Sequence, residues 1–600
     1  MIASFFLAEV VGVFVLTGTA QCVDPPELVR VGPTRPITTV AGGLVQAATI
    51  APTLPAGVVP KVLVDPGTYT ENVAFPTGVD LVLEGRPLTP CDVVLDGSGA
   101  PQPVVRVAGG QTAATVIRGF TVTGGSGAGA GTLGVGRWGG GFYVVNSSPT
   151  IEHNVVEENL VQEAGGGIYC RDSASYVHDN VFRRNVSEGR GGGVALESCD
   201  AVVAENCFVA EPSDCADWSE DYANLGLFFG GAISCGDGDA SIVHANRIRG
   251  NRARMGGGIA VLEGSTSLLV GNEVLRNGIF DSIDFGGGIY VEDANPCLLS
   301  NVVAFNGDVD GQGCFAPLEG GGIYLEDSSA ELIGNTIWGN RTEGSAFDDA
   351  TGGGVAFRGF GTPVLRNNLI WGNVAHPSFG PNVYEGSFVS VTHDLNCIEN
   401  GTHPFDFFTT NPGLIDPAGE DFHLKFGSPL KDAGSHLAGS CILSPFDFEG
   451  DPRVVGGGTD IGADEWSEHL YHVGPTVTPT GGGLLRMVGP PGRSAGVFYA
   501  ALKLSPGYEV PAGVNGATWF LGFDLDPDCD FEGVVVETPA FLLYDDGGGV
   551  SKVLNADGYA DFLLPPIGPL PCPFTLWFQG IQILPPNAKW VTNAEALKLE

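Results

Sequence analysis

The stretch "RARMGGGIAVLEGSTSLLVGNEVLRN" (252–277) combines three consecutive glycines, two short aliphatic runs and two asparagines five residues apart. Nearly the same phrase returns as "LEGGGIYLEDSSAELIGNTIWGN" (318–340). A spacing of about 30 residues that recurs along a chain indicates a solenoid, in which each repeat packs against its neighbours. The triple glycines begin at Gly139, Gly165, Gly191, Gly256, Gly286, Gly320 and Gly352.

Aliphatic residues recur at three fixed places in each repeat. They stand three residues before the first asparagine, two residues after it, and just past the glycines. In the repeat at 318–340 these places hold Leu332, Ile337 and Ile323. Segments this short cannot be helices of about 10–12 residues, so we predict three strands per coil. Coils stacked about 4.8 Å apart then place each aliphatic position in an internal column.

The first asparagine of each pair is expected to stack on its counterpart in the next coil. Asparagine tolerates left-handed turn conformations, and its amide can bond the same residue one coil away. Such a stack satisfies turn polar groups that would cost about 1–3 kcal/mol each if buried without a partner. The expected structural asparagines include Asn272, Asn301, Asn335 and Asn368.

These repeats resemble right-handed parallel β-helix proteins of the pectate-lyase-like kind. Residues 61–85 look like the first coil of that family, and residues 40–57 are placed like its amphipathic capping helix. Residues 411–466 are similar to the closing segment of secreted bacterial β-helix proteins. The resemblance implies an all-β fold, a right-handed three-sided parallel β-helix solenoid. It implies no activity, because this fold hosts lyases, hydrolases, esterases, epimerases and adhesins.

On this interpretation the chain divides into four parts. Residues 1–20 are predicted to be a signal peptide, since an apolar core is followed by small residues. Residues 21–135 form the N-terminal cap and opening coils, and 136–466 carry the repeats and the closing segment. In residues 467–600 the periodicity stops, and apolar stretches divided by Pro and Gly predict a small C-terminal β-sandwich-like domain. We expect a secreted protein, extracellular or on the cell surface, without a membrane span.

The net charge and the cysteine content limit the classes of partner and of site that the protein can have. Lys and Arg number 28 against 69 Asp and Glu, a net charge of −41 that repels nucleic acids and anionic membranes. Thirteen cysteines in an exported chain predict structural disulfides. Four of these cysteines cluster in one irregular stretch without zinc-ligand spacing: Cys199, Cys207, Cys215 and Cys235.

No motif assigns a catalytic residue. A polygalacturonase-like site needs a Gly-His-Gly segment, and none of the ten histidines is flanked by glycines. A lyase needs Ca²⁺ and an Arg or Lys as base. The repeats contain arginines, but surface arginines commonly pair with acids. Two classes stay open: a β-helix that binds carbohydrate or a partner without turnover, and a polysaccharide lyase or esterase acting on an extracellular glycan.

Acidic residues follow the glycines in register, at Asp172, Glu197 and Glu263 and then in pairs. Stacked carboxylates about 5 Å apart repel one another unless they are screened or bridged. Ca²⁺, which takes about six to eight oxygen ligands, is the candidate bridge, and a solvated acidic turn is the alternative. The candidate Ca²⁺ ligands are Glu292, Asp293, Glu326 and Asp327.

Insertions grow at one corner of the predicted coil, at 278–285, 307–319 and 341–351, and they mix Phe with Asp. A face decorated in this way commonly binds a partner. Aromatic rings stack on sugars and carboxylates accept hydrogen bonds from hydroxyls, so this face suits neutral or cationic glycans; the alternative is that the aromatics only cap the coils. The candidate binding residues are Phe280, Asp281, Asp284, Phe285, Asp308, Asp310, Phe315, Phe347, Asp348 and Asp349.

Overall fold

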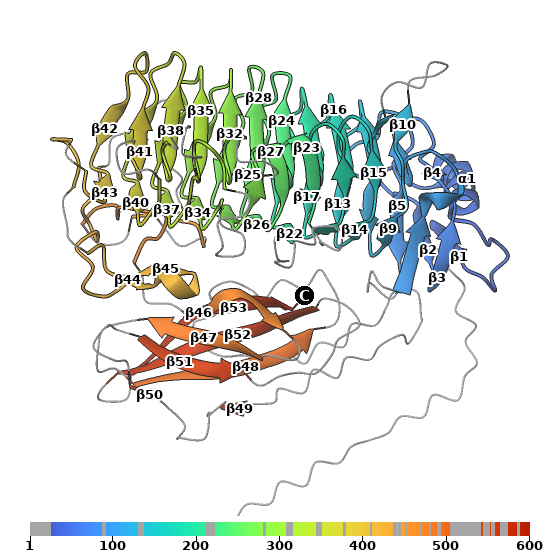
Figure 1. The fold of residues 1–600 in the computed structure, drawn as a ribbon. Helices are drawn as coiled ribbons and strands as arrows, with labels where there is room; N and C mark the ends of the chain where they lie inside the picture. The colour runs from blue at the N-terminus through green and yellow to red at the C-terminus, as the bar shows by residue number, and fades with distance from the viewer. Residues whose placement is uncertain are drawn as a thin grey trace, which may run out of the picture.

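The computed structural model describes residues 26–466, apart from short gaps, and the backbone of eight strands beyond them. The signal peptide predicted at 1–20 lies outside the described residues. From 28 to 398 the described chain winds into a parallel β-helix (Figure 1), which confirms the predicted all-β, three-sided solenoid. The gaps fall at 87–91, 130–136, 210–222, 280–283, 308–315, 344–350, 376–379, 402, 408–410, 436–440, 442–445, 450–452 and 455–456.

Three long parallel sheets form the sides, and each repeating coil gives one strand to each sheet. The 13-stranded sheet comprises β1 (Leu28–Val31), β2 (Lys61–Val64), β5 (Val82–Gly85), β8 (Val116–Arg118), β13 (Thr150–Glu152), β17 (Tyr176–His178), β21 (Val202–Ala204), β25 (Ile242–His244), β29 (Leu268–Val270), β33 (Cys297–Leu299), β36 (Glu331–Ile333), β39 (Val364–Arg366) and β42 (Thr392–Asp394). The 12-stranded sheet comprises β3 (Gly67–Thr70), β6 (Val93–Asp96), β9 (Thr121–Thr123), β14 (Val155–Glu157), β18 (Val181–Arg183), β22 (Cys207–Val209), β26 (Arg247–Arg249), β30 (Glu273–Leu275), β34 (Val302–Ala304), β37 (Thr336–Trp338), β40 (Leu369–Trp371) and β43 (Cys397–Ile398). The 11-stranded sheet comprises β4 (Val73–Ala74), β7 (Val105–Val107), β12 (Phe142–Val145), β16 (Ile168–Arg171), β20 (Val194–Glu197), β24 (Ile233–Gly236), β28 (Ile259–Leu262), β32 (Ile289–Glu292), β35 (Ile323–Glu326), β38 (Val355–Arg358) and β41 (Val383–Glu385).

A fourth, short side was not predicted. It lies between the second asparagine of a coil and the next glycines, where four or five residues are enough to pair with their counterparts one coil away. The insertion at 278–285 begins in its last strand. Its strands are β15 (Leu160–Val161), β19 (Val186–Ser187), β23 (Leu225–Phe229), β27 (Arg252–Met255) and β31 (Gly278–Ile279).

The core consists of the predicted aliphatic columns. Ile289, Ile323 and Val355 pair in register across three coils, and all three are fully buried. The N-terminal end is covered by helix α1 (Val40–Ile50), which lies within the predicted capping segment. The helix passes into a 3₁₀ turn, η1 (Ala51–Thr53), because Pro52 lacks the N–H that would continue the α-helical hydrogen bonds.

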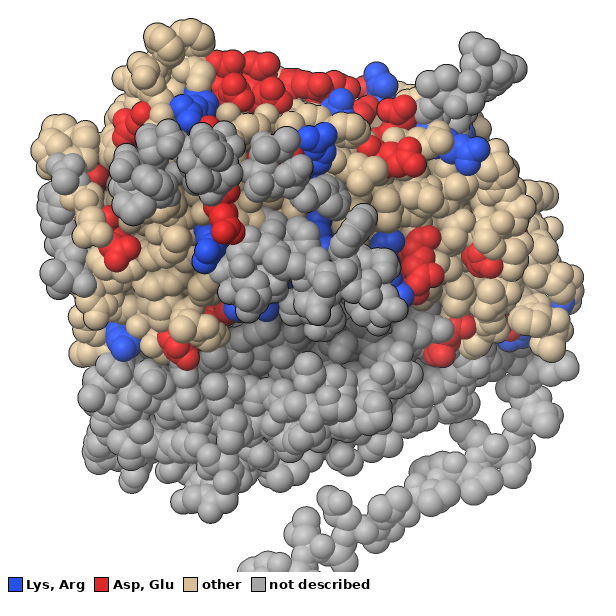
Figure 2. All heavy atoms as spheres, viewed as in Figure 1, with Lys and Arg blue, Asp and Glu red and all other residues tan. Residues whose placement is uncertain are grey.

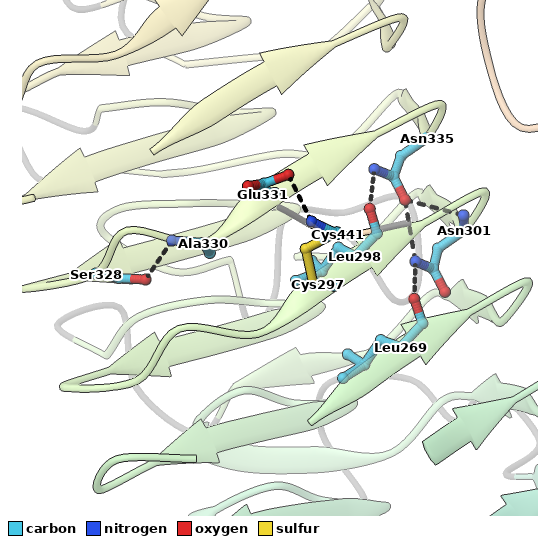
Figure 3. Close-up of a disulfide and its surroundings, with 9 residues drawn as sticks. All are labelled: Leu269, Cys297, Leu298, Asn301, Ser328, Ala330, Glu331, Asn335 and Cys441. Atoms are coloured by element: carbon cyan, nitrogen blue, oxygen red, sulfur yellow. Dashed lines mark hydrogen bonds between the residues drawn. A yellow bond between two sulfur atoms is a disulfide. The ribbon is translucent and has the colours of Figure 1, made fainter. Parts of the chain in front are cut away.

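The asparagines form a continuous buried stack. The Nδ2 atom of Asn301 donates to Asn335 Oδ1 (3.0 Å) and to the Leu269 carbonyl (2.9 Å) (Figure 3). Asn335 repeats this pattern toward Asn368 (2.9 Å) and the Leu298 carbonyl (2.8 Å). The stack contains Asn154, Asn180, Asn206, Asn246, Asn272, Asn301, Asn335, Asn368 and Asn396.

The closing segment folds back along the outer face of the 12-stranded sheet. Its hairpin, β44 (Leu414–Asp416) and β45 (Asp421–Leu424), joins an apolar cluster with residues of that sheet such as Leu369. Glu420 accepts from Arg249 (2.7 Å) and from Arg276 (2.5 Å). These contacts tie the closing segment to β26 and to the turn that follows β30.

One disulfide, Cys297–Cys441, is described, and it joins β33 to the closing segment (Figure 3). The predicted bridges among the clustered cysteines are wrong for Cys199 and Cys235, which are buried thiols. Cys235 occupies an inward position paired with Val261, so its side chain serves as core packing. Cys215 lies outside the described residues.

Beyond residue 469 the described strands form one eight-stranded sheet, in which the β46–β53 pairing is parallel and the other pairings are antiparallel. A sandwich at 467–600 stays a prediction. In the part of the chain that the structure describes, no helix is long and apolar enough to cross a membrane. The strands are β46 (Leu470–Thr478), β47 (Gly482–Val488), β48 (Ser494–Lys503), β49 (Leu542–Leu543), β50 (Lys552–Val553), β51 (Tyr559–Leu564), β52 (Phe574–Leu584) and β53 (Ala588–Leu599).

Candidate functional site

The outer face of the 11-stranded sheet carries a column of aromatic side chains. Strand alternation points Ile323 and Leu325 of β35 into the core and Tyr324 and Glu326 outward. Register places Tyr290 directly beside Tyr324, and their rings stack with centroids 5.4 Å apart and planes 3° apart. Parallel register therefore stacks the outward tyrosines of these two neighbouring coils, and alanines, Ala260 and Ala356, occupy the column on either side.

A second outward column on the same face is charged. Glu292, Glu326 and Arg358 occupy it on three successive coils. Arg358 donates two hydrogen bonds to Glu319 (2.5 and 2.7 Å), which ends the insertion at 307–319. It also donates to the Tyr384 hydroxyl (2.9 Å). An arginine and two glutamates therefore meet on neighbouring coils beside an insertion.

The electrostatics of this column follow from these neighbours. Burial raises the pKa of Glu292, a hydrogen bond with Tyr290 opposes the rise, and the carboxylate of Glu326 adds to it. The hydrogen bonds to Glu319 raise the pKa of Arg358 above its ordinary value, against the effect of burial. Arg358 is therefore a permanently charged ion-pair partner.

An acidic edge borders this face, formed by the residues that directly follow the strands. These residues adopt left-handed backbone conformations, with φ near 50°, which Asp tolerates better than most residues. Figure 2 shows acidic side chains in a row along the upper rim of the β-helix. The acidic edge comprises Asp172, Asp237, Glu263, Asp293 and Asp327.

The acids expected on one edge divide between two adjacent columns, one at the strand ends and one in the turns. Leu262 pairs with Glu292, so Glu263 stands in the column of Asp293 and Asp327. Glu197 instead belongs to the strand column, because it pairs with Arg171. The spacing from the glycines agrees with this division, because Glu197 lies six residues after Gly191, whereas Asp172 and Glu263 lie seven residues after Gly165 and Gly256.

The four predicted Ca²⁺ ligands do not converge. They lie in two separate columns, and the protein itself satisfies oxygens in both. Asp327 Oδ1 accepts from the Phe360 amide (2.7 Å), and Glu326 accepts from the Tyr324 hydroxyl (3.0 Å). Among the described residues, two other groups bring three candidate ligand atoms within 4.8 Å of one another: His393, His403 and Asp406, and His423, Glu449 and Asp464.

Two exposed phenylalanines stand at the acidic edge. Phe360 and Phe388 lie in the turns after β38 and β41, and their rings are 5.5 Å apart and inclined by 32°. They are 68% and 72% exposed, more than any other large apolar side chain of the described residues. The amide of Phe360 bonds Asp327, so the pair, which we call the aromatic step, adjoins the acidic edge. Exposed aromatic surface of this kind is typical of binding sites.

Two of the ten predicted binding residues are described, and they have structural roles. Phe285 packs on Tyr324 with ring centroids 5.0 Å apart. Asp284 is buried and accepts from Arg254 Nε and Nη2, both at 3.1 Å. Both residues therefore make contacts within the coils. The other eight lie outside the described residues: Phe280, Asp281, Asp308, Asp310, Phe315, Phe347, Asp348 and Asp349.

Sequence reasoning missed the residues that the structure brings together most clearly. Glu319 and Arg358 lie within the repeats. The sequence feature that could have identified them is the change of charge in one column, from Glu326 to Arg358. Phe360 and Phe388 lay in turns of unequal sequence, and only their proximity in space reveals the pair.

Comparison with known proteins agrees with this architecture. Residues 167–370 match the family model described as the right handed beta helix region. The chain is a right-handed parallel β-helix protein. No curated protein matches it.

Similar solved structures include two esterases and a phage protein. Pectin methylesterase from carrot is 11% identical, with a TM-score of 0.26, and the match covers 60% of this chain and 87% of the esterase. Pectin methylesterase from Aspergillus niger is 11% identical, with a TM-score of 0.22, over 65% of this chain and 92% of the other. Tailspike protein gp49 of Acinetobacter baumannii bacteriophage Fri1, a capsular polysaccharide depolymerase, is 9% identical, with a TM-score of 0.26, over 80% of this chain and 75% of the tailspike.

Proposed function

We propose that this β-helix protein binds a neutral or cationic polysaccharide along the acidic edge and the aromatic step, without turning it over. The observation that carries the proposal is the exposed pair Phe360 and Phe388 beside Asp327. Phenyl rings pack against the apolar faces of sugar rings, and neighbouring carboxylates accept hydrogen bonds from sugar hydroxyls. An aromatic pair beside carboxylates thus offers both kinds of contact.

The repeating geometry favours a polymer over a small sugar. The acidic edge places one carboxylate per coil, at a coil spacing of about 4.8 Å, on the last coils before the step. A chain of sugars can follow such a row, and each further coil adds a contact. The net charge of −41 opposes polyuronates as well as nucleic acids.

We further propose that the protein acts outside the cell, secreted or on the cell surface. The Cys297–Cys441 disulfide supports this location, because disulfides persist in oxidising compartments. Polysaccharides and surface glycans are the partners found there.

The alternative function is that of a polysaccharide lyase or esterase. The specific observation in its favour is Arg358 with Glu319 and Glu326 on neighbouring coils, since such enzymes combine an arginine with carboxylates. However, Arg358 is held by two hydrogen bonds to Glu319 and remains protonated, so it is poorly suited to act as a base. This geometry favours binding.

Affinity electrophoresis of the purified protein through gels containing a neutral glucan, chitosan or a polyuronate tests the proposal. We expect slower migration with the neutral or cationic polymer and unchanged migration with the polyuronate. The same mixtures, with and without Ca²⁺, are assayed for reducing ends and unsaturated products, and we expect none. Retardation by the polyuronate alone, or by no polymer, contradicts binding at this face; product formation supports the enzymatic alternative.

A further inference from the structure

The apolar columns of the β-helix end in polar side chains at the last coil. His393 pairs in register with Leu365, which is fully buried in the core. Glu385 likewise pairs with Phe357, another core residue. Where earlier coils carry Leu and Phe, the last coil therefore carries His and Glu. The side chain of His393 is 4% exposed and needs partners, because burying a polar group without one costs free energy, whereas the side chain of Glu385 is 42% exposed.

The chain then returns across this end and supplies two more polar side chains. The Nδ2 atom of Asn396, the last asparagine of the stack, donates to Asp406 Oδ1 (3.1 Å), so Asp406 takes the place of the next asparagine. The side chain of Asp406 is 1% exposed. Three residues earlier, the ring of His403 lies on the ring of His393 with centroids 4.2 Å apart.

These four side chains make an unusual cluster. His393 Nδ1 lies 3.2 Å from Asp406 Oδ2, and its Nε2 lies 3.0 Å from Glu385 Oε1. His403 Nδ1 is buried and has no hydrogen-bond partner among the described residues. One ligand atom from each of His393, His403 and Asp406 lies within 4.8 Å of the others. Hydrogen bonds among the described residues therefore do not complete the cluster.

We propose that His393, His403 and Asp406 bind a divalent transition-metal ion, Zn²⁺ by preference. Two imidazoles and a carboxylate are donors that suit Zn²⁺. Tetrahedral zinc with bonds of about 2.0–2.2 Å holds its ligand atoms about 3.3–3.6 Å apart, so the three ligand atoms would draw closer together on binding the ion. Three protein ligands leave a fourth position for water or an outside ligand.

Glu385 has the role of a supporting carboxylate. It contacts the His393 nitrogen opposite to Asp406, so it holds the tautomer in which the nitrogen beside Asp406 is free for the metal. The second group, around His423, is a weaker candidate because it has a single imidazole. Its other two candidate ligands, Glu449 and Asp464, are carboxylates.

The test uses the full chain after dialysis against chelator, titrated with Zn²⁺ by calorimetry, with the metal content measured after gel filtration. The variants are His403→Ala and Glu385→Gln, and the control is His153→Asn, since Asn tolerates the positive φ at that position (52°). His403→Ala removes no hydrogen bond from Nδ1, and circular dichroism checks that each variant folds.

The wild type and His153→Asn should bind one more zinc equivalent than His403→Ala and should melt at a higher temperature with Zn²⁺ than without it. Glu385→Gln should bind that ion about 10–100-fold more weakly, the usual effect of losing a carboxylate that supports a histidine ligand. Equal zinc content in the wild type and His403→Ala would overturn the proposal. Absence of zinc from both proteins would also overturn the proposal. The cluster would then only cap the last coil, with protons shared between its histidines and carboxylates.

Discussion

At the scale of the residue, the amide of Asn335 joins three coils. Its Oδ1 accepts from the backbone and side-chain nitrogens of Asn301, and its Nδ2 donates to Leu298 and Asn368. Asn335→Ala leaves several of these buried groups without a partner, at a cost of about 1–3 kcal/mol in the free energy of unfolding. Urea denaturation measures the change. A variant as stable as the wild type would show that water replaces the amide.

His178 gives the fold a dependence on pH. Burial alone would lower the pKa of His178, but hydrogen bonds with Asp179 (2.9 Å) and Glu152 (3.1 Å) outweigh it and raise the pKa to about 9. The Tyr176 ring stacks on the imidazole, and Arg118 also bonds Glu152.

Because the pKa of His178 in the folded protein exceeds its ordinary value of 6.5, this stabilisation is complete below that pH and is lost as the pH rises through about 9. We expect the melting temperature of the wild type to fall more steeply between pH 7 and 10 than that of His178→Gln, which cannot be protonated. Parallel curves for the two proteins would contradict the assignment of the charge to His178.

Single residues also show what sequence could and could not establish. The asparagine positions were predictable because both their spacing and their turn chemistry repeat. His393 could also have been identified from the sequence, since it stands three residues before Asn396, where every earlier coil has an aliphatic residue. The unpartnered nitrogen of His403 could not have been predicted, because it depends on how the chain returns across the last coil.

At the scale of the element, each inward position of a strand contributes to one shared core. Ile323 of β35 is fully buried between Ile289 and Val355, whereas Ile242 of β25 is 39% exposed. Ile323→Ala should cost about 2–5 kcal/mol in unfolding free energy, the usual penalty for removing a large core side chain. Ile242→Ala, the matched control, should cost clearly less. Equal costs in urea denaturation would refute the assignment of inward and outward positions.

The closing segment depends on one carboxylate. Burial would raise the pKa of Glu420, but hydrogen bonds from Arg249 and the charge of Arg276 outweigh it and lower the pKa. Glu420→Gln removes the charge that these arginines share, at a cost of about 1–3 kcal/mol. Limited proteolysis should then cut residues 411–466 faster than in the wild type. Glu158→Gln, at an exposed ion pair, should not change the rate, and equal rates for all three proteins would count against the docking role.

Elements of the repeat were predictable to different degrees. The three strands per coil follow from aliphatic positions, because each inward column must be apolar. The fourth side does not, because its short strands lie outside those columns. The acids were expected on one edge, and the pairing between coils divides them into a strand-end column with Glu197 and a turn column with Glu263.

At the scale of the whole molecule, the solenoid brings distant turns together in one row. The insertions were predicted to mark the binding face because they grow on a single corner. In the structure, an exposed aromatic pair lies on the neighbouring rim, where Phe360 and Phe388 meet at the acidic edge. That convergence depends on two turns of unrelated sequence, 28 residues apart, and periodicity alone does not reveal it.

The most direct test of the central claim is isothermal titration of the polysaccharide that retards the protein, against the wild type and Phe360→Ala/Phe388→Ala. The control is Phe446→Ala, which removes a phenylalanine that is 50% exposed on the closing segment. Loss of aromatic stacking should weaken binding by about 5- to 140-fold, taking roughly 0.5–1.5 kcal/mol per ring, while the control keeps wild-type affinity. Wild-type affinity in the double variant would contradict the account and would place the glycan elsewhere on the molecule.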